Sequence, residues 1–194
     1  MAVRAGLDRD TVVRAAAKLA DTEGLEVVTL ARLAALLGVR PPSLYNHVAG
    51  QEGLRRELAL YGLSDLAKRM GQAAIGKSGD HALVAIAHAY RDFAREHPGV
   101  HAVCQRAPDP DDPEWVAIGQ EVVGIMLAVL AGYSLTGDDA LHAVRALRSI
   151  VYGFASLEAA GGFGLPLDLD ESFRRLLQMF IAGLHQQHAG ARRT

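Results

Sequence analysis

The segment from Arg40 to His47 carries a short run of side chains whose chemistry suits a nucleic acid. Asn46 has the donor and acceptor pair that reads adenine, and Pro42 offers an apolar contact to a thymine methyl group. Arg40 opens the run, and a guanidinium there can reach guanine or a phosphate. Three further side chains suit phosphate oxygens, namely Ser43, Tyr45 and His47. We therefore expect this segment to enter a major groove of DNA.

Two short predicted helices position these side chains. Thr29 is a good N-cap for a helix that Gly38 ends. A third helix begins at Pro41, because proline is tolerated in the first turn, where its missing N–H has no partner. At 100° per residue, Leu44 and Val48 face inward and the polar side chains face outward. Two short helices joined by a tight turn that contains glycine are typical of a helix-turn-helix.

Helical periodicity runs through almost the whole chain, and no stretch shows the alternation of a strand. The apolar spacing predicts further helices over 8–23, 51–74, 80–97, 113–132, 138–160 and 171–187, with a short one after residue 98. We therefore predict an all-α fold of about nine helices. It comprises an N-terminal three-helix helix-turn-helix domain over 1–50 and a C-terminal helical bundle over 51–194, and the helix over 51–74 connects the two.

The net charge of −2 is unevenly distributed over the 194 residues. Residues 1–56 hold eight Arg and Lys against six Asp and Glu, a balance of +2, and the rest of the chain carries −4. A basic N-terminal part over residues 1–56, here called the head, followed by an acidic remainder agrees weakly with DNA binding. The single cysteine, Cys104, excludes an internal disulfide and favours a reducing, cytoplasmic setting.

The longest apolar run covers residues 122–135 and includes two glycines. It is too short to span a bilayer, so we expect no membrane partner. The helix predicted over 113–132 is apolar on most faces, and we expect it to lie at the centre of the fold.

The segment from Thr29 to Val48 resembles the tetracycline-repressor (TetR) family, and its Gly-Val-x-x-x-Ser-Leu-Tyr-x-His core is a specific signal. The resemblance implies an all-helical homodimer that binds double-stranded operator DNA until a small-molecule effector relieves the binding. It also implies DNA contacts from Thr29, Ser43, Tyr45 and His47. Gln51 completes the expected set of DNA-binding residues. The family often has lysine at this position, so this chain loses a phosphate contact and its binding should be less sensitive to salt.

The C-terminal half resembles the TetR domain named for a Trp-His-Gly motif. The residues that carry this resemblance lie in three segments, over 151–158, 161–164 and 170–173. Tyr152 stands where that subclass usually has histidine, whereas Gly153 is kept. The substitution puts any ligand chemistry of that histidine in question.

The last two predicted helices carry more apolar surface than one small domain can hide. Pairing them with their two-fold mates would make a four-helix interface. The residues expected there are Val144, Leu147, Val151, Phe154, Phe173, Leu177, Phe180, Ile181 and Leu184. The alternative is that both stripes face the core of their own chain.

The sequence indicates an effector pocket less clearly than it indicates the helix-turn-helix. Pockets in helical bundles are mostly apolar with a few polar anchors. The candidates are His88, Tyr90, Trp115, Met126, Tyr152 and Phe154, although aromatic and Met side chains at helical spacing are more often plain core.

The remaining groups of His and Cys residues do not indicate an enzyme active site. The spacing of His97, His101 and Cys104 would place them on one face of a helix. Because Pro98 and Gly99 interrupt that helix, we expect no metal site. The sequence also contains no catalytic or cofactor-binding motif, so we expect no cofactor and no catalytic residue. The predicted function is a DNA-binding transcriptional regulator, most simply a repressor released by a lipophilic molecule. The alternatives are activation, and a helical small-molecule-binding protein or enzyme whose head no longer binds DNA.

Overall fold

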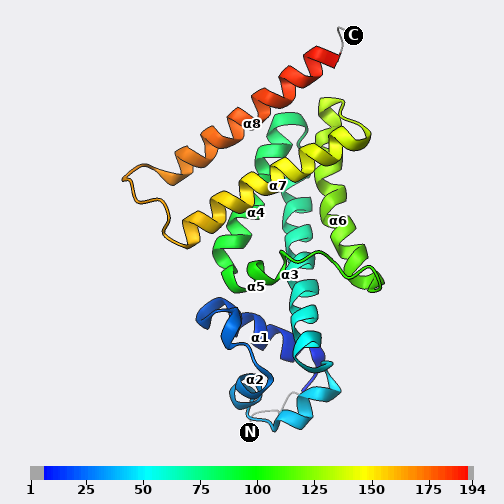
Figure 1. The fold of residues 1–194 in the computed structure, drawn as a ribbon, viewed down its shortest axis with the longest axis vertical. Coiled ribbons are helices and arrows are strands. Elements are labelled where there is room, and N and C mark those ends of the chain that lie inside the picture. The colour runs from blue at the N-terminus through cyan, green and yellow to red at the C-terminus, as the bar shows by residue number, and fades with distance from the viewer. Residues whose placement is uncertain (1–6, 192–194) are drawn as a thin grey trace. The chain divides into compact units, whose positions relative to one another are not determined.

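The computed structural model describes residues 7–191, with side chains over 7–186 (Figure 1). The helices are α1 (Arg9–Glu23), η1 (Leu25–Val27), α2 (Leu30–Leu37), η2 (Pro41–Asn46), α3 (Gly50–Ala74), α4 (Gly79–Glu96), α5 (Pro98–Val103), α6 (Pro113–Leu130), η3 (Ala131–Tyr133), α7 (Gly137–Ala159) and α8 (Leu169–Ala191). The described residues contain no strand, which confirms the all-α prediction.

The chain folds into two compact units that do not follow its order. The first unit joins residues 1–65 to 96–119, and the second joins residues 66–95 to 120–194. The first therefore contains the predicted helix-turn-helix together with the first part of α3, all of α5 and the start of α6.

Helix α1 carries the core of the first unit. Asp8 caps it, and its Oδ1 accepts a hydrogen bond of 2.7 Å from the backbone N–H of Thr11. Its buried side chains recur at helical spacing and are those of Val12, Val13, Ala16, Ala17, Leu19 and Ala20. This apolar stripe holds α1 in the unit, since an isolated helix of this length is marginally stable in water.

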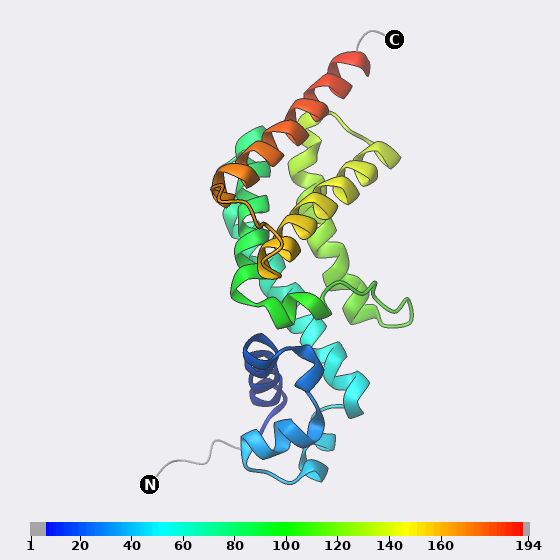
Figure 2. The same ribbon diagram turned by 60° about the vertical axis from the view of Figure 1, so that its left-hand side comes forward.

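A buried arginine organises the second unit, where α7 and α8 lie side by side (Figures 1 and 2). The Arg91 side chain is 2% exposed and donates to both carboxylate oxygens of Glu158, at 2.8 and 2.7 Å. It also donates to Asp170 at 2.8 Å. Its guanidinium lies 5.1 Å from the ring centroid of Phe154 and 4.9 Å from that of Phe173. These contacts tie α4 to both C-terminal helices.

Helix α6 differs from the sequence expectation of a central, buried helix. The segment Pro113–Tyr133 is long and apolar enough to cross a membrane by length and composition, yet only 28% of its most apolar window is buried. The prediction failed because a helix that is apolar on most faces carries no signal of which face packs. Its buried side chains are Trp115, Val122, Met126, Val129 and Leu130.

Candidate nucleic-acid interface

The turn of the helix-turn-helix is built as the sequence predicts. The hydroxyl of Thr29 caps α2 by accepting a hydrogen bond of 3.2 Å from the backbone N–H of Arg32. Gly38 ends α2 in the left-handed region, at a φ of 66°, where a side chain would be strained. Arg40 is then extended, with φ −82° and ψ 143°, as a residue before proline should be.

The third helix is a 3₁₀-helix, whereas the sequence analysis assumed α-helical rotation. The backbone N–H of Ser43 donates to the carbonyl of Arg40 at 2.9 Å, and that of His47 donates to the carbonyl of Leu44 at 2.9 Å. Both bonds span three residues, as in a 3₁₀ turn. Two prolines at the start of a six-residue helix leave few amides to form the longer α bonds.

In the 3₁₀ conformation of η2, the residues expected to face inward are still buried and those expected to face outward are still accessible. Leu44 is fully buried and Val48 is 4% exposed, so the two anchor the segment in the core of the first unit. Tyr45 is 61% exposed, a large value for an aromatic side chain. The other predicted contact residues of the segment are also accessible: Arg40, Pro42 and Asn46 are exposed, and Ser43 and His47 are half-buried.

Gln51, which is also expected to contact DNA, is half-buried and hydrogen-bonded within the first unit. Its side-chain Nε2 donates a hydrogen bond of 2.6 Å to the backbone carbonyl of Val28. That bond ties the first turn of α3 to the residue before the cap of α2, so Gln51 positions the head. Thr29 is exposed as well as being a cap, and so remains accessible to a phosphate.

A carboxylate that no sequence pattern indicated joins α1 to the start of α5. Asp21 on α1 accepts hydrogen bonds from the backbone N–H groups of Gly99 and Val100, both at 3.0 Å, and lies 2.8 Å from Nδ1 of His97. It thus caps the N-terminus of α5, where an anion is favoured. Gly99 lies so close to α1 that an added Cβ would come within 2.1 Å of the Ala20 carbonyl oxygen. The signal in the sequence was a Pro-Gly pair, which indicates a helix start but names no partner.

A second brace joins α3 to the loop before α6. Arg56 donates to both carboxylate oxygens of Asp112 and, at 2.7 Å, to Glu114. The Arg56 guanidinium lowers the pKa of the Asp112 carboxyl from its ordinary 3.8 to about 2. The same bonds, with Asp112 first, raise the pKa of Arg56. This pair is therefore ionised at any physiological pH.

The structure separates the residues predicted to line an effector pocket. Tyr90 and Met126 line a small cavity of about 10 Å³ in the second unit. Trp115 lines a different cavity, in the first unit. His88 and Phe154 pack against Phe173, with ring centroids 5.2 and 5.0 Å from it, and Tyr152 is 39% exposed on α7.

The structure places most of the predicted dimer residues in the core of their own chain. Eight of the nine are at most 9% exposed, and only Phe180 is half-buried. These side chains therefore pack within their own chain, as the alternative interpretation of the two stripes expects. The spacing identified the apolar stripe correctly, but two adjacent faces of one helix can both be apolar, and the sequence does not say which faces inward. The exposed apolar side chains of α7 and α8 are Leu141, Tyr152, Leu157 and Met179.

Two of the residues considered as metal ligands make other contacts in the structure. His97 contacts Asp21 at 2.8 Å, and Sγ of the buried Cys104 lies 3.9 Å from the carbonyl oxygen of Ala59. Within residues 7–186, no group of three or more His, Cys, Asp or Glu is placed to hold an ion.

Comparisons with known proteins agree with this architecture. The family described as "Tetracyclin repressor-like, C-terminal domain" matches residues 83–180. YobS of Bacillus subtilis strain 168, an uncharacterized HTH-type transcriptional regulator, is 38% identical over 186 residues, covering 95% of this chain and 96% of that protein. Rv0681 of Mycobacterium tuberculosis, also an uncharacterized HTH-type transcriptional regulator, is 34% identical over 193 residues, covering 98% of this chain and 88% of that protein.

Two solved structures share the fold. One is the Streptomyces coelicolor TetR family protein ActR in complex with (S)-DNPA, with a TM-score of 0.69 and 22% identity, covering 93% of this chain and 98% of that one. The other is BioQ with its double-stranded DNA operator, with a TM-score of 0.68 and 22% identity, covering 93% and 99%. Because each is only 22% identical to this chain, these two structures show a shared fold and nothing about function.

Proposed function

This chain belongs to the tetracycline-repressor (TetR) family of helix-turn-helix transcriptional regulators, and we propose that it is a homodimeric repressor released from operator DNA by a small lipophilic molecule. The observation that carries the proposal is the η2 segment. Its anchors Leu44 and Val48 are buried, and its polar and aromatic side chains are exposed. BioQ, which shares the fold, is known in complex with its own operator.

In the proposed complex, η2 lies in the major groove. Asn46 reads an adenine edge, Pro42 packs on a thymine methyl group, and Arg40 reaches a guanine or a phosphate. Tyr45 and His47 hold phosphate oxygens and fix the register of the head on the duplex. Each base contact contributes about 1–3 kcal/mol of discrimination, whereas the phosphate contacts bind every sequence alike.

The effector site of the proposal is the cavity of the second unit. Its walls come from α3, α4, α6 and α7 and are mostly apolar: Met70, Ile86, Ala87, Tyr90, Met126, Leu147, Arg148 and Val151. A cavity of about 10 Å³ holds at most one water, so an effector must push these side chains apart. Such an effector binds the expanded state better and shifts the protein toward it, which is the condition for ligand-relieved binding. ActR, of the same fold, binds (S)-DNPA.

The dimer of the proposal uses the exposed faces of α7 and α8. Leu141 and Leu157 on α7 are 45% and 50% exposed, and Met179 on α8 is 67% exposed. Pairing these faces about a two-fold axis buries that surface in an isologous interface. The same axis sets two heads about 34 Å apart, one DNA turn, as paired half-sites require. The proposed chain acts by binding alone, in the cytoplasm, as expected of a transcriptional regulator similar to YobS and Rv0681.

Fluorescence anisotropy with duplexes from the flanking intergenic DNA tests the proposal. The double variant Tyr45→Ala, His47→Ala should lose at least tenfold in affinity, because side chains that hold phosphates contribute to binding on any sequence. Tyr61→Ala is the matched control, since Tyr61 is a partly exposed tyrosine of the same unit. Equal affinity of the double variant and the control would refute the role of η2.

A further inference from the structure

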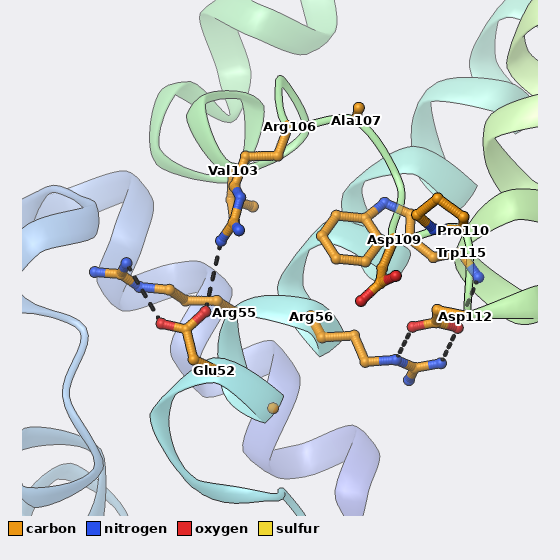
Figure 3. Close-up of a pocket in the computed structure, with 11 residues that line it drawn as sticks. Glu52, Arg55, Arg56, Val103, Arg106, Ala107, Asp109, Pro110, Asp112 and Trp115 are labelled. Atoms are coloured by element: carbon orange, nitrogen blue, oxygen red, sulfur yellow. Dashed lines mark hydrogen bonds and ion pairs between the residues drawn. The ribbon is translucent and has the colours of Figure 1, made fainter.

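The first unit contains a cavity of about 430 Å³ that the proposed function does not use (Figure 3). Its walls come from the first turns of α3, the end of α5, the loop that follows and the start of α6. The lining residues with polar side chains are Glu52, Arg55, Arg56, Arg106, Asp109 and Asp112. Every lining residue belongs to one unit. The volume lies within the range of small-molecule pockets, about 300–1,000 Å³.

Three arginines line this cavity, and their pairing is unequal. Arg56 is held by Asp112 and Glu114. Arg55 and Arg106 converge on the single carboxylate of Glu52, at 3.9 and 3.5 Å (Figure 3). Strong N–H to carboxylate bonds are about 2.7–2.9 Å long, so both of these contacts are loose. This end of the cavity therefore holds two guanidinium groups for one carboxylate, and a second carboxylate would balance their charge.

Two residues that line the cavity each carry a buried donor that lacks an acceptor within the described protein. They are Nε of Arg55 and the indole Nε1 of Trp115. Trp115 is only 8% exposed, so its N–H is withdrawn from bulk solvent. Buried N–H groups nearly always have a partner, and each that does not calls for an explanation. Figure 3 shows the indole ring between the Arg106 side of the cavity and the Arg56–Asp112 pair.

We propose that this cavity is a binding site for a small planar organic acid, separate from the apolar cavity of the second unit. The carboxylate of the ligand accepts hydrogen bonds at the Arg55 and Arg106 end, which suits the planar forks of guanidinium groups. Its flat body lies along Trp115 and Val103, and a second oxygen accepts from the indole N–H. The loose Glu52 contacts and the unpaired indole N–H are thereby accounted for together.

The position of the site connects it to the head. Glu52 and Arg55 lie in the first turns of α3, which begins three residues after His47. A ligand that bridges them to Arg106 and Trp115 joins the start of α3 to segment 103–115 within one unit. We expect it to change operator affinity, and this consequence alone rests on the proposed function.

Binding is tested on the full chain without DNA. The probe is 4-hydroxybenzoate, followed by calorimetry and by the emission of Trp115, the only tryptophan of the chain. We expect saturable binding with a dissociation constant below about 1 mM and a change in emission at saturation. Methyl 4-hydroxybenzoate, which lacks the charge, should bind at least tenfold more weakly.

Variants assign the binding to this cavity. Arg106→Gln should weaken binding at least tenfold, and its side chain is 65% exposed, so the fold tolerates the change. Arg14→Gln is the matched control, since Arg14 is an exposed arginine of the same unit, paired with Asp10. It should bind as the unaltered chain does. No binding at about 1 mM, or equal binding by the acid and the ester, or equal binding by both variants, would overturn the proposal. A chain that fails to bind DNA but passes this test retains the site and loses only the proposed function.

Discussion

Replacing Gly99 with alanine tests the brace between α1 and α5. A Cβ at this position would lie 2.1 Å from the carbonyl oxygen of Ala20 and 2.2 Å from its carbonyl carbon. Both atoms belong to the backbone of α1 and cannot rotate away as a side chain could. Restoring an ordinary contact of 3.4 Å means that α5 must move about 1.3 Å from α1. The two 3.0 Å bonds that Asp21 accepts at the start of α5 cannot survive that movement.

The magnitude follows from the overpacking and from the broken hydrogen bonds. Overpacking in a core costs about 1–3 kcal/mol, and hydrogen bonds to a charged group contribute about 1.5–3 kcal/mol each. One overpacked contact and two lost bonds together cost about 4–9 kcal/mol. Partial relaxation of the six-residue helix α5 brings the result to the lower end of that range, so we expect Gly99→Ala to lower the free energy of unfolding by about 4–5 kcal/mol, or the melting temperature by roughly 10 °C.

Thermal and urea unfolding of both variants measure the effect. Gly124→Ala is the control, because Gly124 is an exposed residue of α6 whose added Cβ meets nothing within 4 Å. That variant should be neutral or more stable by up to about 1 kcal/mol, as alanine favours helix. If Gly99→Ala melted within about 2 °C of the unaltered chain, the close approach of α1 and α5 would be refuted.

Three further predictions concern charges and the head. The pKa of Asp112 in the folded chain lies below its ordinary value, so its contribution to the free energy of unfolding is present above pH 4 and is lost as the pH falls from about 4 to about 2. In acid unfolding, the Asp112→Asn variant should therefore lose less stability over that pH window than the unaltered chain does. Glu158→Gln removes the bidentate partner of the buried Arg91 and should cost about 3 kcal/mol in urea unfolding, while an unchanged midpoint would contradict a buried ion pair. Gln51→Lys should steepen the dependence of log affinity on log salt by about one unit in anisotropy titrations, and an unchanged slope would show that position 51 faces no phosphate.

The local features of the head were predictable because short-range rules determine them. Thr29 caps α2, Gly38 ends it, and Leu44 and Val48 are buried, as capping and helical spacing predict. The conformation of η2 was predicted less well, since two prolines shift a six-residue helix toward 3₁₀ bonding.

Long-range contacts were not predictable from spacing. Asp21 meets the start of α5 across 78 residues, and no periodicity links the two segments. Arg91 lies among the buried side chains of α4, and its partners Glu158 and Asp170 are on other helices. The stripes of α7 and α8 were identified, but burial shows that they face their own chain. Pattern reveals which residues share a face, whereas the partner of that face depends on the tertiary fold.

Footprinting of the ligand-free full chain on its own flanking intergenic DNA, at low ionic strength, tests the central claim most directly. The account predicts one protected region with two-fold symmetry, its half-sites about 34 Å apart, and loss of that protection in the Tyr45→Ala, His47→Ala variant. The absence of protection on every such duplex would contradict the assignment of η2 as a DNA-reading element.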